Sequence, residues 1–278
     1  MAEKEYAQAL RPGMQGSVVQ GKIYKYTIEK VLGQGSFGIT YLANTMMKGP
    51  LGEISVQVTL KEYFARDLSS RKPDGTVASV SDSSSLAGKY GKAFQRESEN
   101  LSKMKHPGIV KVLEAFEANG TYYYAMEYLS GGSLDERIRG NGIPEEEALS
   151  IIGKVGDAIS YMHGRKVMHL DLKPKNIMLR SNGDPVVIDF GLSKQFDSKG
   201  EPESSSSIGL GTPGYAPLEQ ANQTSERVFQ PTIDIYALGA TLYKMLTGST
   251  PPNASSILNE GFPENKLRSK GISDMTIS

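Results

Sequence analysis

The sequence predicts an α+β protein in two parts: a β-rich N-terminal part with one main helix, and a larger, mostly helical part. Strand-like alternation and glycine-punctuated turns fill the first part. After Gly131-Gly132, apolar residues recur at helical spacing instead. We therefore expect a linker near 127–132. The expected parts are a lead-in over 1–24, an N-terminal lobe over 25–128 and a C-terminal lobe over 129–278.

The N-terminal part is expected to be antiparallel strands around one helix. Alternating residues predict strands at Tyr26–Val31, Ile39–Ala43 and Ile54–Phe64. Residues 65–90 are rich in Ser, Gly and Asp and are expected to form a mobile insertion, with helical spacing from about Tyr90 to Met104. Asn119-Gly120 is a favoured hairpin turn, so the flanking segments 110–116 and 121–128 are expected to pair.

The C-terminal part is expected to be helical, with short strands and loops between the helices. Ser133 can cap a short helix, and Pro144 followed by three glutamates suits the first turn of a longer one. Residues 234–246 predict a strongly apolar helix, and the Ser- and Gly-rich residues 192–210 are expected to be mobile.

Composition narrows the class of protein. Lys and Arg number 31, as do Asp and Glu, which argues against a nucleic-acid-binding protein with a broad basic surface. The lack of cysteine excludes disulfides and thiolate chemistry, and three histidines argue against a multi-histidine metal site. Neither a signal-peptide core nor an apolar run of about 20 residues is present, so we expect a cytoplasmic chain without a membrane segment. The sequence does not indicate an oligomeric state.

The first motif with chemical meaning is Gly33-Gln34-Gly35-Ser36-Phe37-Gly38, which lies between two expected strands. Glycines let backbone N–H groups approach phosphate oxygens closely. Because a strand rather than a helix follows, the motif suits a flap over ATP phosphates better than a dinucleotide-binding turn. Taken alone, it also fits an ordinary glycine-rich hairpin.

Lys61 and Glu97 are a second candidate pair. Lys61 ends an apolar strand, where its ammonium can reach the α- and β-phosphates of a nucleotide if an acid holds it. Glu97, on the following helix, is the candidate acid. Either residue alone also fits an ordinary surface ion.

The segment His169-Leu170-Asp171-Leu172-Lys173-Pro174-Lys175-Asn176 is more specific, because it places an acid, a lysine and an amide on one loop. Asp171 can orient an attacking hydroxyl and accept its proton. Lys173 can offset charge on a transferring phosphoryl group, and Asn176 offers a hard oxygen to magnesium. Asp189, in Asp189-Phe190-Gly191, follows an apolar run. A carboxylate at the end of a buried strand is costly unless it binds a cation, so Asp189 is a candidate magnesium ligand.

From about Tyr26 to Gly248 these motifs resemble those of eukaryotic-type protein kinases. The resemblance implies the two-lobed protein-kinase fold, with a small antiparallel β lobe and a larger helical lobe. It implies catalytic roles for Lys61, Glu97, Asp171 and Lys173. It also implies that Asn176 and Asp189 bind magnesium, or manganese in its place. The residues that it implies around ATP are Leu32, Gly33, Gly35, Ser36, Phe37, Gly38, Thr40, Thr59, Lys61, Met126, Glu127, Leu129, Met178 and Asp189.

The resemblance also indicates the substrate. Lys173 together with Thr212 matches the serine/threonine pattern, which implies transfer of the γ-phosphoryl group of ATP to Ser and Thr hydroxyls of proteins, including this chain. Residues 211–215 match the loop that receives the substrate residue, and Asp234 matches the aspartate that braces the catalytic loop. Residues 38–41 and 216–220 are similar to bacterial members of the family.

Two departures concern the active site. Leu170 replaces the arginine that would receive an activation-loop phosphate, so we expect phosphorylation within Ser204–Ser207 not to switch the enzyme on. Thr40 and Thr59 stand where Val and Ala usually cover the adenine ring, which predicts weaker ATP binding.

Two further departures concern the C-terminal side. The glutamate motif reads Ala-Pro-Leu-Glu, which places Glu219 at the position of a buried glutamate. Its arginine partner and the last helices of the lobe would lie beyond Ser278. Because an unpaired buried carboxylate costs ~3–5 kcal/mol, we expect either a fragment truncated at its C-terminal end or a loosened lobe.

The main alternative is a pseudokinase-like nucleotide-binding scaffold, which would share the fold without the chemistry. Such a protein usually lacks the lysine, the base or the metal aspartate, whereas Lys61, Asp171 and Asp189 are all present. A small-molecule kinase would not need the peptide-docking loop at 211–215. A phosphate-transfer assay with Asp171→Asn as the control separates these interpretations.

Overall fold

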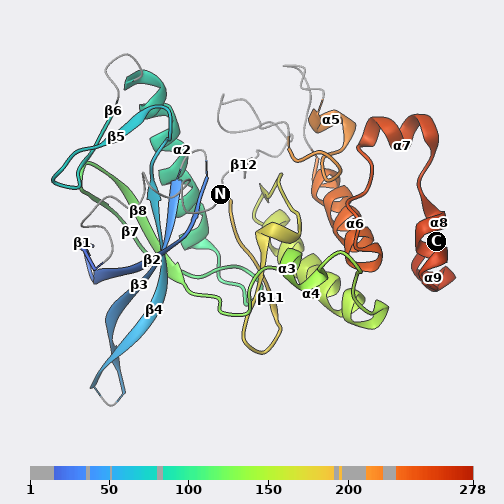
Figure 1. Cartoon of the computed structure of the whole chain (residues 1–278), viewed down its shortest axis with the longest axis horizontal. Helices are drawn as coiled ribbons and strands as arrows, with labels where there is room; N and C mark the ends of the chain where they lie inside the picture. The colour runs from blue at the N-terminus through green and yellow to red at the C-terminus, as the bar shows by residue number, and fades with distance from the viewer. Residues whose placement is uncertain are drawn as a thin grey trace. The chain divides into compact units, whose positions relative to one another are not determined.

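The protein forms two compact units. The computed structural model describes residues 16–35, 38–50, 52–79, 84–190, 194–195, 211–221 and 230–277. One unit comprises Met1–Lys105 with Val110–Tyr128, and the other comprises His106–Ile109 with Leu129–Ser278. The first is rich in strands and the second in helices, so the predicted α+β class is confirmed (Figure 1).

The first unit is built on a six-stranded antiparallel sheet in the order β1-β2-β3-β4-β8-β7 (Figure 1). Its strands are β1 (Val18–Gln20), β2 (Lys25–Gln34), β3 (Gly38–Gly49), β4 (Gly52–Tyr63), β7 (Val112–Ala118) and β8 (Thr121–Glu127). Strand β1 lies within residues 1–24, which were expected to be an irregular lead-in. It forms a strand there because it pairs with β2 and buries Val19 in the core. Strands β3 and β4 extend past their predicted ends, as they continue to pair as far as Gly49 and Gly52.

The hairpin predicted around Asn119-Gly120 is confirmed. Both residues have positive φ angles, 51° and 72°, which a tight turn between antiparallel strands requires. The turn joins β7 to β8 with Ala118 directly opposite Thr121. Helix α2 (Ser84–Lys103) begins six residues before the predicted start at Tyr90.

The stretch expected to be a mobile insertion contains a hairpin. Strands β5 (Ser69–Arg71) and β6 (Val77–Ser79) pair antiparallel. The backbone N–H of Val77 donates to Asn119 O at 2.8 Å, which attaches the hairpin to the β7–β8 turn. Tertiary contacts, which composition does not reveal, therefore attach this hairpin to the sheet.

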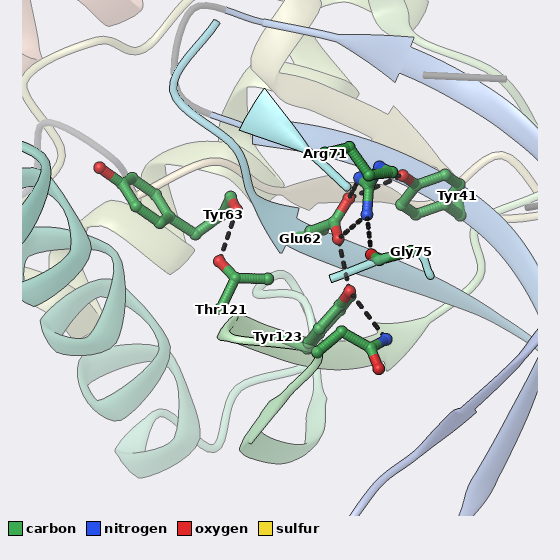
Figure 2. Close-up of polar contacts among 8 residues, drawn as sticks. Tyr41, Glu62, Tyr63, Arg71, Gly75, Thr121 and Tyr123 are labelled. Atoms are coloured by element: carbon green, nitrogen blue, oxygen red, sulfur yellow. Dashed lines mark hydrogen bonds and ion pairs between the residues drawn. The ribbon is translucent and has the colours of Figure 1, made fainter. Parts of the chain in front are cut away.

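A buried ion pair holds the hairpin to the sheet. Arg71 donates to both carboxylate oxygens of Glu62 on β4, at 3.1 and 2.5 Å, and to Gly75 O at 3.0 Å (Figure 2). The hydroxyls of Tyr41 and Tyr123 donate to the same carboxylate. We call Glu62, Arg71, Tyr41 and Tyr123 the buried brace. It attaches the β5–β6 hairpin to strand β4 through buried side chains.

The second unit is mostly helical. Its helices are α3 (Leu134–Ile138), α4 (Glu145–His163), α5 (Leu218–Ala221), α6 (Thr232–Thr247), α7 (Ala254–Glu260), α8 (Glu264–Ser269) and α9 (Asp274–Ile277). Two short pairs join β10 (Ile177–Leu179) to β11 (Pro185–Val187) and β9 (Val167–Met168) to β12 (Lys194–Gln195). A 3-10 turn, η2 (Pro174–Asn176), precedes β10.

Two predicted helix starts in the second unit, at Ser133 and Pro144, are confirmed, whereas α6 begins at Thr232, two residues before the predicted start. The Ser133 side chain caps α3 and accepts from Glu136 N, while the Glu136 carboxylate accepts from Ser133 N, a reciprocal capping box. Pro144 is the N-cap residue of α4, and three glutamates fill its first turn. Within the part of the chain that the structure describes, no helix combines the length and apolar character needed to cross a bilayer.

Candidate active site

Lys61 and Glu97 form an ion pair within the first unit. Lys61 Nζ lies 2.9 Å from Glu97 Oε1, and the same oxygen accepts a hydrogen bond from the Tyr124 hydroxyl at 2.8 Å. The Glu97 side chain is 6% exposed and that of Lys61 18%. Since β4 carries Lys61 and α2 carries Glu97, the pair joins the sheet to the helix. The sequence motifs indicate Lys61 and Glu97 but not Tyr124.

Residues expected around adenine share one face of the sheet with Lys61. Thr40 lies directly opposite Lys61, and Thr59 lies directly opposite Met126. Side chains two positions apart on a strand point to the same face, and so do directly opposed residues of neighbouring strands. Thr40, Thr59, Lys61, Tyr124 and Met126 therefore form one continuous surface of the sheet.

The glycine motif lies at the turn between β2 and β3. Gly33 and Gln34 belong to β2, and Gly35 N donates to Gly38 O at 2.9 Å. A Cβ atom on Gly38 would lie 2.8 Å from Glu62 O, so only glycine fits there. Ser36 and Phe37 lie outside the described residues.

The remaining predicted adenine residues fall in different units. Glu127, at the end of β8, accepts from Lys111 N at 2.9 Å, and Leu32, on β2, is 39% exposed. Leu129 and Met178 belong to the second unit, where Leu129 is buried and Met178 lies on β10. Leu32 and Glu127 are thus positioned by the first unit, and Leu129 and Met178 by the second.

Asp234 braces the loop that carries the catalytic candidates. It is fully buried, and its carboxylate accepts from the backbone N–H groups of His169 and Leu170, each at 2.9 Å. His163 Nε2 lies 2.8 Å from the same carboxylate. Leu170 has a φ of 65°, a strained conformation for a branched side chain. The two N–H bonds to Asp234 hold it there.

Asp171 lies at the centre of a polar cluster. Its Oδ1 accepts from the Thr212 hydroxyl at 2.6 Å and its Oδ2 from Lys173 Nζ at 2.7 Å, while Lys173 Nζ also donates to Thr212 at 2.8 Å. Asn176 Nδ2 donates to the Asp171 backbone O and to its Oδ2, at 2.8 and 3.1 Å. The predicted catalytic-loop residues are thus brought together with the substrate-loop threonine in one unit. The Asp171 side chain is 15% exposed.

Asp189 follows the buried strand β11, as expected. It has a φ of 62°, and Ile188 N donates to Asn176 O at 2.9 Å, which connects the Asp189 segment to the catalytic loop. The rings of His169 and Phe190 pack 5.2 Å apart, and His169 Nε2 lies 3.1 Å from Ile188 O. His169 is therefore used in packing and backbone contacts. Gly191 lies outside the described residues.

The chemistry of Asn176 and Asp189 fits a magnesium site. The Asn176 amide nitrogen is engaged by Asp171, which leaves the amide oxygen as its cation-binding atom. Asp189 supplies a carboxylate on a neighbouring segment of the same unit. An amide and a carboxylate oxygen are the hard ligands that magnesium prefers.

The expectation that Glu219 is a buried carboxylate is wrong. Glu219 is exposed, and the next residue, Gln220, is 1% exposed and donates to Leu170 O at 2.6 Å. One residue along a helix turns a side chain by about 100°, so the orientation of α5 decides which of the two faces inward. Gln220 links α5 to the catalytic loop, a role that the sequence motifs did not indicate. Ser204–Ser207 lie outside the described residues, so the expectation about their phosphorylation stays a prediction.

Comparison with known proteins agrees with this geometry. The protein kinase domain model matches residues 26–270. Serine/threonine-protein kinase PrkC of Bacillus subtilis (strain 168) is 30% identical over 236 residues, which cover 84% of this chain and 32% of PrkC. Serine/threonine-protein kinase pkn3 of Myxococcus xanthus is 32% identical over 252 residues, which cover 88% of this chain and 41% of pkn3. This chain therefore spans less than half the length of either relative.

A solved structure supports the fold. The chain "PpkA-294 apo form" matches with a TM-score of 0.71 and 27% identity, over 89% of this chain and 85% of that chain. The two-lobed kinase fold expected from the motifs is therefore confirmed, as is the resemblance to serine/threonine kinases that include bacterial ones. This chain belongs to the protein kinase family.

Proposed function

We propose that this chain transfers the γ-phosphoryl group of ATP to Ser and Thr hydroxyls of protein substrates, including its own. The observation that carries the proposal is the cluster in which one Asp171 oxygen binds Thr212 and the other binds Lys173. Together, the two donors fix the orientation of the base and leave it partly exposed. A small aliphatic hydroxyl can take the place of Thr212 or lie beside it at Asp171.

In the proposed reaction Asp171 orients the substrate hydroxyl and accepts its proton as the new P–O bond forms. The bond between the γ-phosphorus and the β-γ bridging oxygen of ATP breaks in the same step, and ADP leaves. Lys173 offsets the charge of the moving phosphoryl group. Asn176 and Asp189 would hold magnesium, or manganese in its place, and the ion would neutralise phosphate charge when bound. These residues contribute by positioning and electrostatics rather than by a covalent step.

The first unit is proposed to supply the nucleotide-binding residues. Lys61, held by Glu97, would fix the α- and β-phosphates, and the turn at 33–38 would cover them. Thr40, Thr59 and Met126 share the Lys61 face of the sheet, which supports a role in contacting adenine. Leu32 and Glu127, in the same unit, are proposed to contact adenine as well. Leu129 and Met178 belong to the second unit, and their contact with adenine stays a prediction.

We propose residues 25–128 and 129–278 as the N-terminal and C-terminal lobes of this enzyme, acting in the cytoplasm on protein partners. The balanced charge supports a protein rather than a nucleic-acid partner. A pseudokinase-like scaffold is not favoured, since the matched relatives are named as serine/threonine kinases.

Phosphoryl transfer from labelled ATP with magnesium tests the proposal. The wild-type chain is expected to label itself and a Ser/Thr peptide, with phosphoserine or phosphothreonine as the product. Asp171→Asn keeps the shape of the side chain but removes the base, so labelling should fall by roughly 100-fold or more, while the melting temperature stays close to that of wild type. Equal labelling by the two proteins would contradict the assignment of Asp171.

We also propose that activation-loop phosphorylation does not switch the enzyme on. The Leu170 side chain is apolar and buried, so it offers no cation to a phosphate. Its backbone N–H donates to Asp234, and its C=O accepts from Gln220. Changing Ser204–Ser207 together to Ala should leave peptide phosphorylation unchanged. Loss of activity in that variant would refute the proposal.

A further inference from the structure

Tyr124 lies directly opposite Lys61 on the neighbouring strand β8. Its hydroxyl donates to Glu97 Oε1 at 2.8 Å, the oxygen that also binds Lys61 Nζ at 2.9 Å. Lys61 Nζ lies 5.5 Å from the centre of the Tyr124 ring, on its face. One side chain thus contacts both members of the ion pair, through its hydroxyl and its ring.

The Tyr124 ring also packs against α2 at a second point. Its centre lies 5.0 Å from that of Phe94, which is three residues before Glu97 on the same helix. Phe94 in turn packs against Tyr63 at the end of β4, with ring centres 5.8 Å apart. Tyr124 therefore contacts α2 at two positions about one helical turn apart. Both contacts require one rotation of the helix about its axis and one distance from the sheet.

We propose that Tyr124 is a positioning residue that holds Glu97 toward Lys61. The proposal rests on the proposed function of this chain as a kinase. Glu97 is almost completely buried, so its charge needs donors at every stage of the reaction. When Lys61 donates hydrogen bonds to nucleotide phosphates, the Tyr124 hydroxyl still donates to Glu97. This bond keeps the carboxylate, and hence α2, in place.

The matched test compares Tyr124→Phe with Tyr123→Phe. Each variant removes one hydroxyl that donates to a buried glutamate, but Tyr123 serves Glu62 on the opposite face of the sheet. Tyr124→Phe should lower kcat/KM for ATP by roughly 10- to 100-fold, the equivalent of one hydrogen bond to a charged group. Tyr123→Phe should leave kcat/KM per folded protein unchanged, and the KM for a peptide substrate should not move in either variant.

A double-mutant cycle with Glu97→Gln separates positioning from a general structural role. If Tyr124 acts through the Glu97 charge, adding Tyr124→Phe to Glu97→Gln should lower kcat/KM by less than about threefold. Additive losses would overturn the proposal. So would equal effects of Tyr124→Phe and Tyr123→Phe, or a Tyr124→Phe chain that fails to fold.

Absence of phosphoryl transfer by the wild-type chain would contradict the kinase activity alone. The affinity of the same variants for magnesium-ATP would then be measured by isothermal titration calorimetry. Weaker binding by Tyr124→Phe than by Tyr123→Phe would still support the positioning role. Equal binding would overturn it.

Discussion

Two buried glutamates on opposite sides of one sheet are held by the same kinds of partner, but the cations paired with them differ in exposure. Lys61 and Glu62 are consecutive on β4, so their side chains point to opposite faces, with Tyr124 and Tyr123 as their cross-strand neighbours. On one face Lys61 and Tyr124 both bind Glu97. On the other, the buried brace surrounds Glu62.

The difference lies in what remains open. The Lys61 side chain is 18% exposed, whereas that of Arg71 is 2% and that of Glu62 is 0% exposed. In the buried brace both carboxylate oxygens receive an arginine N–H and a tyrosine hydroxyl. The Glu97 pair retains a partly exposed cation, which in the proposed function would contact the nucleotide. Exposure therefore separates a group suited to chemistry from a structural one, although the residue types are alike.

The largest effect should come from Lys61→Met. The variant removes the partly exposed cation but keeps most of the apolar stem. The Tyr124 hydroxyl still donates to Glu97, so enough folded protein should remain to measure activity. Loss of one preorganised charged donor lowers kcat by about 100- to 1000-fold in comparable sites. The measurement is peptide phosphorylation from labelled ATP, normalised to folded protein determined by circular dichroism.

Arg71 provides the control for that experiment, since it is the cation of the other cluster. Arg71→Met should change activity per folded protein little, because Arg71 lies on the face away from Lys61. A Lys61→Met protein with undiminished activity would refute the role assigned to Lys61. Loss of activity in a fully folded Arg71→Met protein would contradict the purely structural role assigned to Arg71.

The largest effect on stability, as opposed to activity, should come from Arg71→Met itself. The substitution leaves the buried Glu62 carboxylate without its ion partner, which costs ~3–5 kcal/mol. The free energy of unfolding, measured by urea denaturation, should fall by this amount. Adding Glu62→Gln should recover part of the loss because the uncompensated charge is removed. Additive destabilisation in the double variant would show that the two residues act independently.

The sequence indicates one cluster and not the other, for a physical reason. Lys61 and Glu97 belong to a set of motifs whose order and spacing identify them together. Arg71 follows two serines in a segment of turn-forming composition, and nothing local distinguishes it from a surface cation. Its burial depends on Glu62, Tyr41 and Tyr123, which meet only when the sheet has formed.

The second unit shows the same limit at a smaller scale. The Asp171, Lys173 and Asn176 cluster could be predicted because all three lie on one loop of eight residues. The inward side chain of α5 could not, since it depends on how the helix is turned. A one-residue difference replaced a predicted carboxylate, Glu219, with the amide of Gln220. Motifs thus identify reactive groups, while packing decides which neighbours support them.

The smallest expected effect is the pH dependence of the buried brace. Burial and the adjacent Glu62 charge raise the pKa of Tyr123 well above its ordinary value of 10.0. The unfolded chain releases this proton above about pH 10 while the folded chain keeps it, so the free energy of unfolding falls as pH rises. Below pH 10 the contribution is fully present. For one tyrosine the slope is about 1.4 kcal/mol per pH unit.

Tyr123→Phe should therefore flatten the decline measured by urea denaturation between about pH 10 and 11. Since Tyr41 donates to the same carboxylate and burial raises its pKa as well, part of the decline should remain in the single variant. Tyr41→Phe with Tyr123→Phe should flatten it further. Parallel curves for wild type and both variants would mean that the brace opens to solvent below pH 11, and the contrast in exposure between the two faces would no longer explain their roles.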